Sequence, residues 1–469
     1  MFYFLGMQQS NPSVSAPRAI PGPRSWPVVG NGLQVLLQGG LFPLLERSWK
    51  RHGDTFRVDL GPKRLVAIAH PDDLERVLLS ERDSFYKGTA YDQFRVLVGD
   101  RGMVTIEGET WRSHRRVAQP SFNKGAIAAL GTKMTAATST MLESWETRLQ
   151  VGADFDIYEE LLALTMWIIG DTLFSLDLRG SIDSSAEAFS VALEMLSVRG
   201  NELVRLPLAW PTPGNRKLRR ALATLDETVH KIIRDRRASG ERPPDLLSAL
   251  LAGSDEHGQP FDDAALRDEV ITFFLAGHET TALALSWTWF MLATNPEIQE
   301  KLHAEVDAVL GGRTPTAEDM ARLPYTRMVL HEAQRLYTPT WSGARDVIAP
   351  VELGGHRVEA GELVMYLPYF THRHPEFWDE PHRVNPERFT PEAMQGRHKC
   401  AYVPFSAGPR MCIGNHFSLL EGALILAMIS QRYRFTLSPR ARIEPQFQIT
   451  MRPKYGVLLT VAARRAGGG

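Results

Sequence analysis

The stretch of sequence that decides the fold lies near the C-terminus and reads Phe405-Ser406-Ala407-Gly408-Pro409-Arg410-Met411-Cys412-Ile413-Gly414. Two glycines flank the cysteine, and glycine permits tight turns and the close approach of a flat ligand to the backbone. An apolar helical pattern covers residues 413–432, so Cys412 is expected at or near a helix N-terminus. Backbone N–H groups at that end, together with Arg410, favour a thiolate, which is the form of cysteine that ligation of iron requires. The alternative is a buried structural cysteine beside a turn.

The longest helical pattern in the chain covers residues 262–294. Asp262 or Asp263 can cap its N-terminus, and Asn295 followed by Pro296 ends it. The middle of the pattern is apolar on all sides, which is typical of a helix buried in the core. We therefore expect this helix to run through the centre of the protein.

Inside this helix lies the cluster Ala276-Gly277-His278-Glu279-Thr280-Thr281. A glycine within a helix costs about 1 kcal/mol relative to alanine, and a buried carboxylate costs more unless it is paired or protonated. Small side chains at 276 and 277 leave space beside the helix, and Thr280 lies one turn beyond Ala276, so its hydroxyl is expected to point there. The alternative is a helix kink in which the threonine hydroxyl bonds to a backbone carbonyl.

Two other helical stretches each carry a pair of residues whose spacing places them on the same helix face. Glu332 and Arg335 lie three apart on a predicted helix over 325–337, so they share one face. Trp111 and Arg115 lie four apart on a basic, aromatic stretch, which also places them on one face. The alternatives are an ordinary surface ion pair in the first case and a solvated basic face in the second.

The remaining patterns predict a mainly α-helical fold with a minor, segregated β portion. Helical patterns dominate residues 72–340, with loops expected near 80–105 and 200–215. Strand patterns occur at 56–60 and 65–69, which predict a hairpin, and at 351–353, 357–358 and 363–367. We expect one domain over residues 20–462, a disordered N-terminal tail at 1–19 and a C-terminal tail at 463–469.

Composition excludes several classes of protein. The chain has 53 Lys and Arg against 54 Asp and Glu, a balance that gives no support for nucleic-acid binding. Only two cysteines occur in 469 residues, which suits a reducing cytosol rather than a disulfide-stapled secreted protein. The apolar start at residues 1–7 is far shorter than the ~20 residues of a membrane span. We therefore expect a cytoplasmic protein without a stable membrane anchor.

Taken together, these motifs resemble those of the cytochrome P450 family over residues 20–462. The cysteine loop matches all five fixed positions of the family's ligand signature, namely Phe405, Gly408, Arg410, Cys412 and Gly414. The cluster at 276–281 is similar to the family's oxygen-binding helix motif. Glu332 and Arg335, together with Arg388 from the segment 385–389, match the family's buried charge triad, which supports the fold and the haem loop. The resemblance implies the cytochrome P450 fold.

The resemblance also implies roles for individual residues. Cys412 would be the axial ligand of the iron of haem b, and Glu279 and Thr280 would deliver protons to the co-substrate dioxygen. The other residues implied to contact the haem or its propionates are Trp111, Arg115, Ala276, Gly277, Arg345, Phe405, Gly408, Arg410 and Gly414. Cys400 lies outside the signature and is expected to be structural.

The implied reaction inserts one atom of dioxygen into an apolar substrate such as a fatty acid, terpenoid or steroid. Electrons would come from a separate ferredoxin- or flavodoxin-type donor with its reductase. We expect a monomer of the soluble bacterial type, with motifs nearest to the fatty-acid-hydroxylase-like branch. Pocket walls are expected from Phe94, Leu97, Leu203, Phe273, Trp341, Phe447 and Ile449. Two alternatives are a peroxide-driven haem-thiolate enzyme and a haem carrier or sensor without catalysis.

Overall fold

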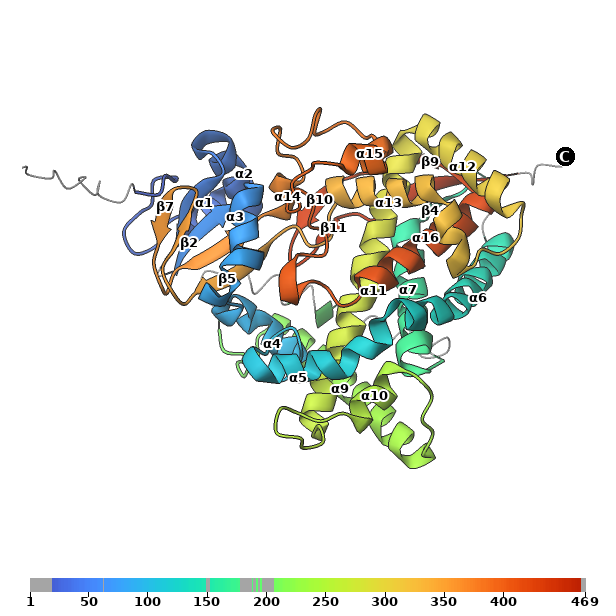
Figure 1. The fold of residues 1–469 in the computed structure, drawn as a ribbon, viewed down its shortest axis with the longest axis horizontal. Coiled ribbons are helices and arrows are strands. Elements are labelled where there is room, and N and C mark those ends of the chain that lie inside the picture. The colour runs from blue at the N-terminus through green and yellow to red at the C-terminus, as the bar shows by residue number, and fades with distance from the viewer. Residues whose placement is uncertain are drawn as a thin grey trace, which may run out of the picture.

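Helices form most of the protein, and the sheet with β2 and β5 lies at one end of it while the strands β4 and β9 lie at the other (Figure 1). The computed structural model describes residues 19–61, 63–148, 152–177, 188, 191, 192, 195 and 206–464. Within these residues the expected fold class, mainly helical with a segregated β portion, is confirmed. The predicted N-terminal tail at 1–19 falls almost wholly outside the described residues, as does Leu203.

The main sheet joins parts of the chain that lie far apart in sequence. Its strand order is β1 (Thr55–Leu60), β2 (Lys63–Ile68), β8 (Leu363–Tyr366), β5 (Gly343–Val347) and β3 (Phe85–Tyr86). The predicted hairpin is confirmed, because β1 and β2 pair antiparallel with Thr55 opposite Ile68. The antiparallel pairing of Phe85 with Val347 then attaches β3 to the edge of the sheet.

Three smaller sheets complete the β portion. They comprise β6 (Val351–Leu353) with β7 (His356–Val358), β10 (Pro445–Phe447) with β11 (Met451–Pro453), and β4 (Asp154–Asp156) with β12 (Leu458–Ala463) and β9 (Tyr433–Leu437). The predicted C-terminal tail starts one residue too early, because Ala463 pairs with Tyr433 as the last residue of β12.

The helices carry most of the core. They are α1 (Gly32–Leu37), α2 (Leu41–His52), α3 (Pro71–Glu75), α4 (Asp92–Val98), α5 (Gly108–Ala118), α6 (Lys124–Arg148), α7 (Ile157–Phe174), α9 (Pro213–Ser239), α10 (Leu246–Ala252), α11 (Asp263–Thr294), α12 (Pro296–Leu310), α13 (Pro324–Leu336), α14 (Pro368–Thr371), α15 (Pro391–Met394) and α16 (Asn415–Arg432). In the part of the chain that the structure describes, every helix is too short or too polar to cross a bilayer.

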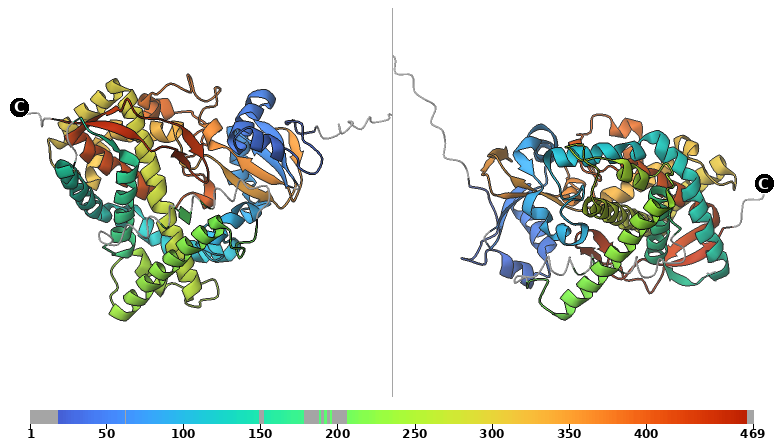
Figure 2. Two further views of the ribbon diagram at one scale, coloured as in Figure 1. Left: turned by 180° about the vertical axis from the view of Figure 1, so that it is seen from behind. Right: turned by 90° about the horizontal axis from the view of Figure 1, so that it is seen from below.

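The central helix α11 has the bounds that its sequence predicts. The side chain of Asp262 caps its N-terminus by accepting a hydrogen bond from the amide of Ala265 at 2.8 Å. Pro296 starts the next helix directly after the end of α11. The helix packs against α7, α13 and α16 (Figure 1), and α9 crosses it near its start (Figure 2), where Arg267 and Asp226 form an ion pair. Neighbouring elements therefore cover most of its apolar surface.

Two predicted boundaries differ from the structure. The segment 80–105 was expected to be a loop, yet it contains β3 and the helix α4. The last predicted helix was placed at 413–432, but α16 starts at Asn415 because Gly414 occupies the N-cap position. Short elements such as β3 depend on a distant pairing partner, so the local pattern does not reveal them.

A buried ion pair anchors the loop that follows α14. The guanidinium of Arg335 donates two hydrogen bonds to Glu332, at 2.7 and 2.8 Å, and both side chains are fully buried. Arg335 also donates to the carbonyl oxygens of His372 and Pro381. The third predicted member, Arg388, lies 3.7 Å from Glu332. The structure thus brings the three residues together and uses them to attach α13 to residues 372–388.

Replacing Arg335 with methionine should destabilise the fold strongly. The Arg335→Met variant leaves the Glu332 carboxylate buried without its partner, which typically costs about 3–5 kcal/mol. We expect the free energy of unfolding to fall by that amount in urea denaturation followed by circular dichroism. Arg383→Met is the matched control, because Arg383 makes the same kind of pair with Glu380 at the surface and should lose less than about 1 kcal/mol. Equal losses in both variants would contradict this account.

Candidate functional site

Cys412 lies in a tight loop directly before α16. Its amide donates a hydrogen bond to the carbonyl oxygen of Phe405 at 3.0 Å, which closes the loop. Burial raises the pKa of the Cys412 thiol overall, although the N–H of Gly414 and the charges of Arg115 and Lys87 oppose that effect. The residue is nevertheless exposed. The sulfur therefore faces a space that is enclosed by protein atoms.

Gly408 is required by close packing between the cysteine loop and the turn at Arg76–Ser80. Its φ is +72°, and a Cβ at this position would lie 2.2 Å from the carbonyl oxygen of Leu78. A side chain would therefore push the loop away from this turn. Gly414 is less constrained, because a Cβ there would lie 3.9 Å from the sulfur of Cys412, an ordinary van der Waals contact.

Helix α11 opens onto a space at one place only. Between Ala265 and Ala293 every residue is buried or half-buried except Ala276, which is exposed. Thr280, one turn later, is half-buried, and its hydroxyl donates a hydrogen bond to the carbonyl oxygen of Ala276 at 2.7 Å. The Thr280 hydroxyl therefore makes the bond to a backbone carbonyl that the sequence analysis gave as the alternative. Both residues nevertheless border the same open strip of the helix.

Two contacts bring this part of α11 beside the cysteine loop. Phe122 stacks on Phe273 of α11 at a centroid distance of 5.5 Å and lies 4.0 Å from where a Cβ of Gly414 would be. The hydroxyls of Thr281 and Ser418, from α11 and α16, are 3.0 Å apart. We infer that Ala276 and Cys412 border one internal space from two sides.

Gly277 does not face this space. A Cβ at Gly277 would lie 2.5 Å from the Cδ1 atom of Ile169 on α7. The glycine therefore allows α7 and α11 to approach each other closely. The absent side chain thus makes room for a helix, and the expected contact of Gly277 with the cofactor stays a prediction.

Glu279 is buried and is bonded on another side of α11. Its carboxylate forms an ion pair with Arg452 of β11 and accepts a hydrogen bond from the hydroxyl of Thr450 at 3.2 Å. The Glu279 and Thr280 side chains therefore have different partners, although the residues are adjacent in sequence. Arg452 was not expected from the sequence, because the short strand β11 that carries it has no motif of its own.

A group of cations surrounds the entrance of the cysteine loop. The guanidinium of Arg410 lies 3.9 Å from the ring centroid of Trp111, and that of Arg115 lies 5.9 Å from it. Arg115 also donates a hydrogen bond to the carbonyl oxygen of Met411 at 2.9 Å. Arg410 pairs with Glu107, and Arg345 interacts with the same carboxylate. Four of the predicted propionate contacts are thus brought together.

Lys87 belongs to the same group, although no sequence motif marks it. Its ammonium donates to the carbonyl oxygen of Val104 at 2.9 Å and lies 5.0 Å from the ring centroid of Tyr91. Burial lowers the pKa of Lys87 well below its usual value, and the charges of Arg345 and Arg410 add to that effect. Strand β3, which ends directly before Lys87, places it there by pairing with β5.

These residues fit a haem group. Arg115, Arg345 and Arg410 carry three positive charges beside the buried amine of Lys87, and Glu107 is the carboxylate that pairs with Arg410 and interacts with Lys87 and Arg345. The excess of positive charge suits the two propionates of haem, which form charge-assisted hydrogen bonds with such groups. The exposed Cys412 would supply an iron ligand, and the exposed Ala276 would leave room for a flat ring. The site therefore has a ligand, a space and compensating charge.

Cys400 lacks these properties. Burial and the nearby charge of Glu75 raise the pKa of its thiol to about 11. The residue is fully buried and packs in an apolar cluster with Val403 and Ile20. A thiol in such surroundings is inert, so the environment favours Cys412 as the ligand.

The predicted pocket residues fall into two groups. Phe94 and Leu97 of α4 pack in the same apolar cluster as Phe273 of α11, and Leu97 is fully buried. Ile449 packs against that cluster as well. Trp341 and Phe447 belong to a different apolar cluster, around α2 and the main sheet.

The rotamer of Trp341 is fixed by its contacts. The indole N–H donates a hydrogen bond to the carbonyl oxygen of Gln448 at 2.7 Å. Its ring packs edge-to-face against Phe447, and Phe447 stacks on Phe42 at a centroid distance of 3.4 Å. Trp341 and Phe447 therefore attach β10 to α2, and their place in the pocket wall stays a prediction.

Known proteins are similar to this chain over nearly its whole length. A sequence profile described as "Cytochrome P450" matches residues 20–460. The chain is 37% identical to cyclooctat-9-en-7-ol 5-monooxygenase of Streptomyces melanosporofaciens, over 92% of this chain and 95% of that protein. It is 32% identical to pentalenene oxygenase of Streptomyces avermitilis, over 95% and 97%. The crystal structure of the cytochrome P450DA haem domain matches with a TM-score of 0.86 and 27% identity, covering 96% of this chain and 98% of that one.

The variant Lys87→Met should release haem faster than the wild type. The variant removes the Lys87 amine, which would donate a hydrogen bond to a haem propionate. A hydrogen bond to a charged group contributes about 1.5–3 kcal/mol. We expect transfer of haem to haem-free myoglobin to accelerate by about tenfold or more. Lys63→Met is the control, because Lys63 is exposed and lies on the same sheet. An unchanged rate for Lys87→Met would remove Lys87 from the site.

Proposed function

We propose that this chain, which belongs to the cytochrome P450 family and is a P450 monooxygenase, binds haem b through Cys412 and oxidises an apolar substrate of the terpenoid class. The observation that carries the ligand assignment is the position of Cys412. Its sulfur is accessible, lies directly before a helix and has Arg115 and Lys87 nearby. The N–H of Gly414 and the charges of Arg115 and Lys87 favour the ionised sulfur that would bind iron, and they oppose the effect of burial.

When bound, a thiolate-ligated haem activates dioxygen with two electrons, so that one oxygen atom enters the substrate. The residues of this chain would support that chemistry in defined ways. The N–H of Gly414 stabilises negative charge on the sulfur of Cys412. Arg410, Arg345, Lys87 and Arg115 would bind the propionates and so fix the plane of the ring.

Proton delivery is proposed for Thr280 and Glu279. The Thr280 hydroxyl borders the open strip of α11 and is oriented by the carbonyl oxygen of Ala276. The Glu279 carboxylate, bonded to Arg452 and Thr450, would take up protons on the β11 side of the helix. To supply Thr280 it would have to exchange its bond with Arg452 for a water molecule near Thr280. Arg452 would then act as a positioning residue.

Two relatives support the substrate class. Their names give cyclooctat-9-en-7-ol and pentalenene as what they oxidise, and both are terpenoids. The apolar residues beside α11, including Phe94 and Phe273, offer a surface that suits such a molecule. A fatty acid is the second candidate and is compared directly in the experiment below.

Electrons would come from a separate ferredoxin- or flavodoxin-type protein. Arg112 and Arg116 are exposed on α5, on either side of Arg115, which bonds to the residue before Cys412. An acidic donor docking there would approach the sulfur closely, and opposite charges would steer the encounter. We propose a monomer in the bacterial cytoplasm, in line with the Streptomyces relatives.

The proposed activity is tested by product analysis with labelled oxygen. The purified enzyme is supplied with a ferredoxin, its reductase, NADPH and ¹⁸O₂, and is offered either a cyclic terpene hydrocarbon or a saturated fatty acid. We expect one ¹⁸O atom in a terpene alcohol, no product with Cys412→Ser, and no turnover with hydrogen peroxide alone. Turnover with peroxide alone, or exclusive oxidation of the fatty acid, would contradict the proposal.

The variant Thr280→Ala should uncouple electron consumption from product formation. Loss of the hydroxyl removes a proton donor, and such groups contribute about 10²–10⁴-fold to rates, so product per NADPH should fall by at least about tenfold. Thr288→Ala is a matched control, because Thr288 donates the same kind of bond to Ala284 at 2.7 Å in the buried part of α11. If both variants keep normal coupling, Thr280 has no role in proton delivery.

A further inference from the structure

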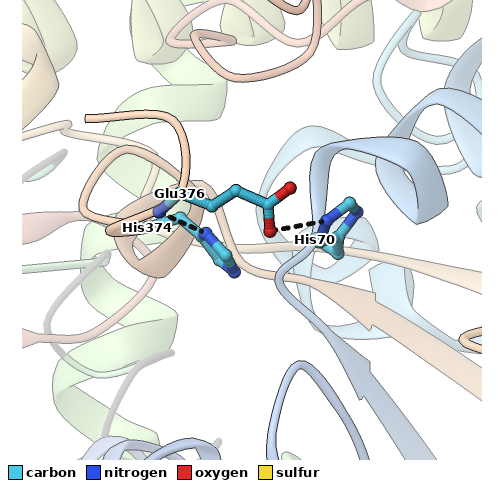
Figure 3. A group of neighbouring side chains, drawn as sticks. All are labelled: His70, His374 and Glu376. Atoms are coloured by element: carbon cyan, nitrogen blue, oxygen red, sulfur yellow. Dashed lines mark hydrogen bonds and ion pairs between the residues drawn. The ribbon is translucent and has the colours of Figure 1, made fainter. Parts of the chain in front are cut away.

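Outside the haem site, two histidines and a glutamate meet at the surface between α3 and the loop after α14. Figure 3 shows the Glu376 carboxylate lying between the imidazole rings of His70 and His374. One ligand atom from each residue lies within 4.8 Å of the others. The Nε2 atom of His70 is 3.7 Å from a carboxylate oxygen of Glu376. We propose that these three side chains bind a divalent transition-metal ion, with Zn²⁺ as the best fit.

His374 would have to exchange one hydrogen bond for the metal ion. Its Nε2 atom lies 3.1 Å from a carboxylate oxygen of Asp54, and its Nδ1 atom accepts a hydrogen bond from the amide of Glu376 at 3.3 Å. Because Nε2 faces Asp54, Nδ1 is the nitrogen that would bind the ion, in exchange for its bond to the amide of Glu376. A carboxylate behind a histidine in this way is typical of metal centres.

His70 has a similar arrangement. It stands at the N-cap of α3, where its Nδ1 atom accepts a hydrogen bond from the amide of Asp72 at 3.2 Å. A carboxylate oxygen of Asp72 lies 3.6 Å from the same nitrogen. When a metal binds at Nε2, the proton must move to Nδ1, and Asp72 can accept the hydrogen bond that results. Each histidine thus has a carboxylate on the side away from the metal.

The rings are also fixed by packing. His70 and His374 lie edge to face at a centroid distance of 5.4 Å. The ring of Phe377 packs against both, at 5.2 and 5.3 Å. Glu376 is the mobile partner, because its side chain is 66% exposed. It can therefore close the remaining gap to the ~2.0–2.2 Å bonds that zinc requires.

The donor set determines which ion is expected. Two imidazoles and one carboxylate, with a fourth position left for water, are ligands that suit zinc and other late transition metals. Magnesium and calcium prefer oxygen ligands and should not compete. A bound ion would connect α3, which leads into the turn that packs on Gly408, to the loop whose His372 carbonyl binds Arg335. It would therefore brace the scaffold on which the cysteine loop rests.

A neighbouring group is a poorer candidate. Glu75, His398 and Cys400 also place ligand atoms within 4.8 Å of one another. His398, however, already lies 3.2 Å from both Glu75 and Asp72. Cys400 is fully buried, and its thiol has a raised pKa, so it resists the ionisation that zinc binding requires. Cys400 consequently serves as a control.

The test measures zinc binding by calorimetry on the tag-free, haem-loaded protein after treatment with EDTA. We expect one zinc per chain, no binding of magnesium, and a rise in the midpoint of thermal unfolding with zinc. Glu376→Gln and His70→Ala, both near the surface, should each weaken zinc binding by more than about tenfold. Cys400→Ala and the exposed-site variant His257→Ala should bind zinc like the wild type.

Three results would overturn the proposal: absence of zinc binding to the wild type at micromolar zinc, unchanged affinity in both Glu376→Gln and His70→Ala, or loss of binding in Cys400→Ala. The last result would assign the ion to the neighbouring group. None of these measurements depends on catalytic activity, so they test the metal site independently of the proposed monooxygenase reaction.

Discussion

The structure depends on a single electrostatic constraint, which is that the sulfur of Cys412 lies among protein atoms and yet must carry a negative charge to bind iron. Burial alone raises the pKa of this thiol and favours its neutral form. The N–H of Gly414, the start of α16 and the charges of Arg115 and Lys87 oppose that effect. A metal cation bound to the sulfur would complete this balance, because a coordinating thiol is deprotonated outright.

The charges that meet near this sulfur come from parts of the chain that are distant in sequence. Lys87 follows β3, Arg345 lies on β5, Arg115 on α5 and Arg410 in the cysteine loop itself. The antiparallel pairing of β3 with β5 places the first two side by side. The main sheet therefore brings together Lys87 and Arg345, which are two of the four members of the cationic group. The buried pair of Glu332 and Arg335 then secures the loop that leads from this sheet toward the cysteine.

Local motifs predicted the parts of the site that lie within a single element. The cysteine loop, the bounds of α11 and the face shared by Glu332 and Arg335 could be read from the sequence, because spacing along a helix or turn determines them. Contacts between elements could not be predicted in this way. Lys87 carries no motif, and the bond between Glu279 and Arg452 joins residues far apart in sequence.

Two residues have packing contacts that their functional interpretation did not include. Gly277 belongs to the motif on α11, but its missing side chain accommodates Ile169 of α7. Trp341 follows α13 closely in sequence, as a pocket residue would, but its indole is committed to Gln448 and Phe447. Hydrophobicity and position are the same for a residue that lines a cavity and one that fills the core, so the sequence alone does not separate the two.

The most direct test of the central claim is the absorption spectrum of the dithionite-reduced protein with carbon monoxide, recorded for the wild type, Cys412→Ala and Cys400→Ala. If Cys412 supplies the thiolate, the wild type and Cys400→Ala show a strongly red-shifted Soret band, and Cys412→Ala lacks it. A histidine-type band in the wild type, or a red-shifted band that persists in Cys412→Ala and is lost in Cys400→Ala, would contradict the account.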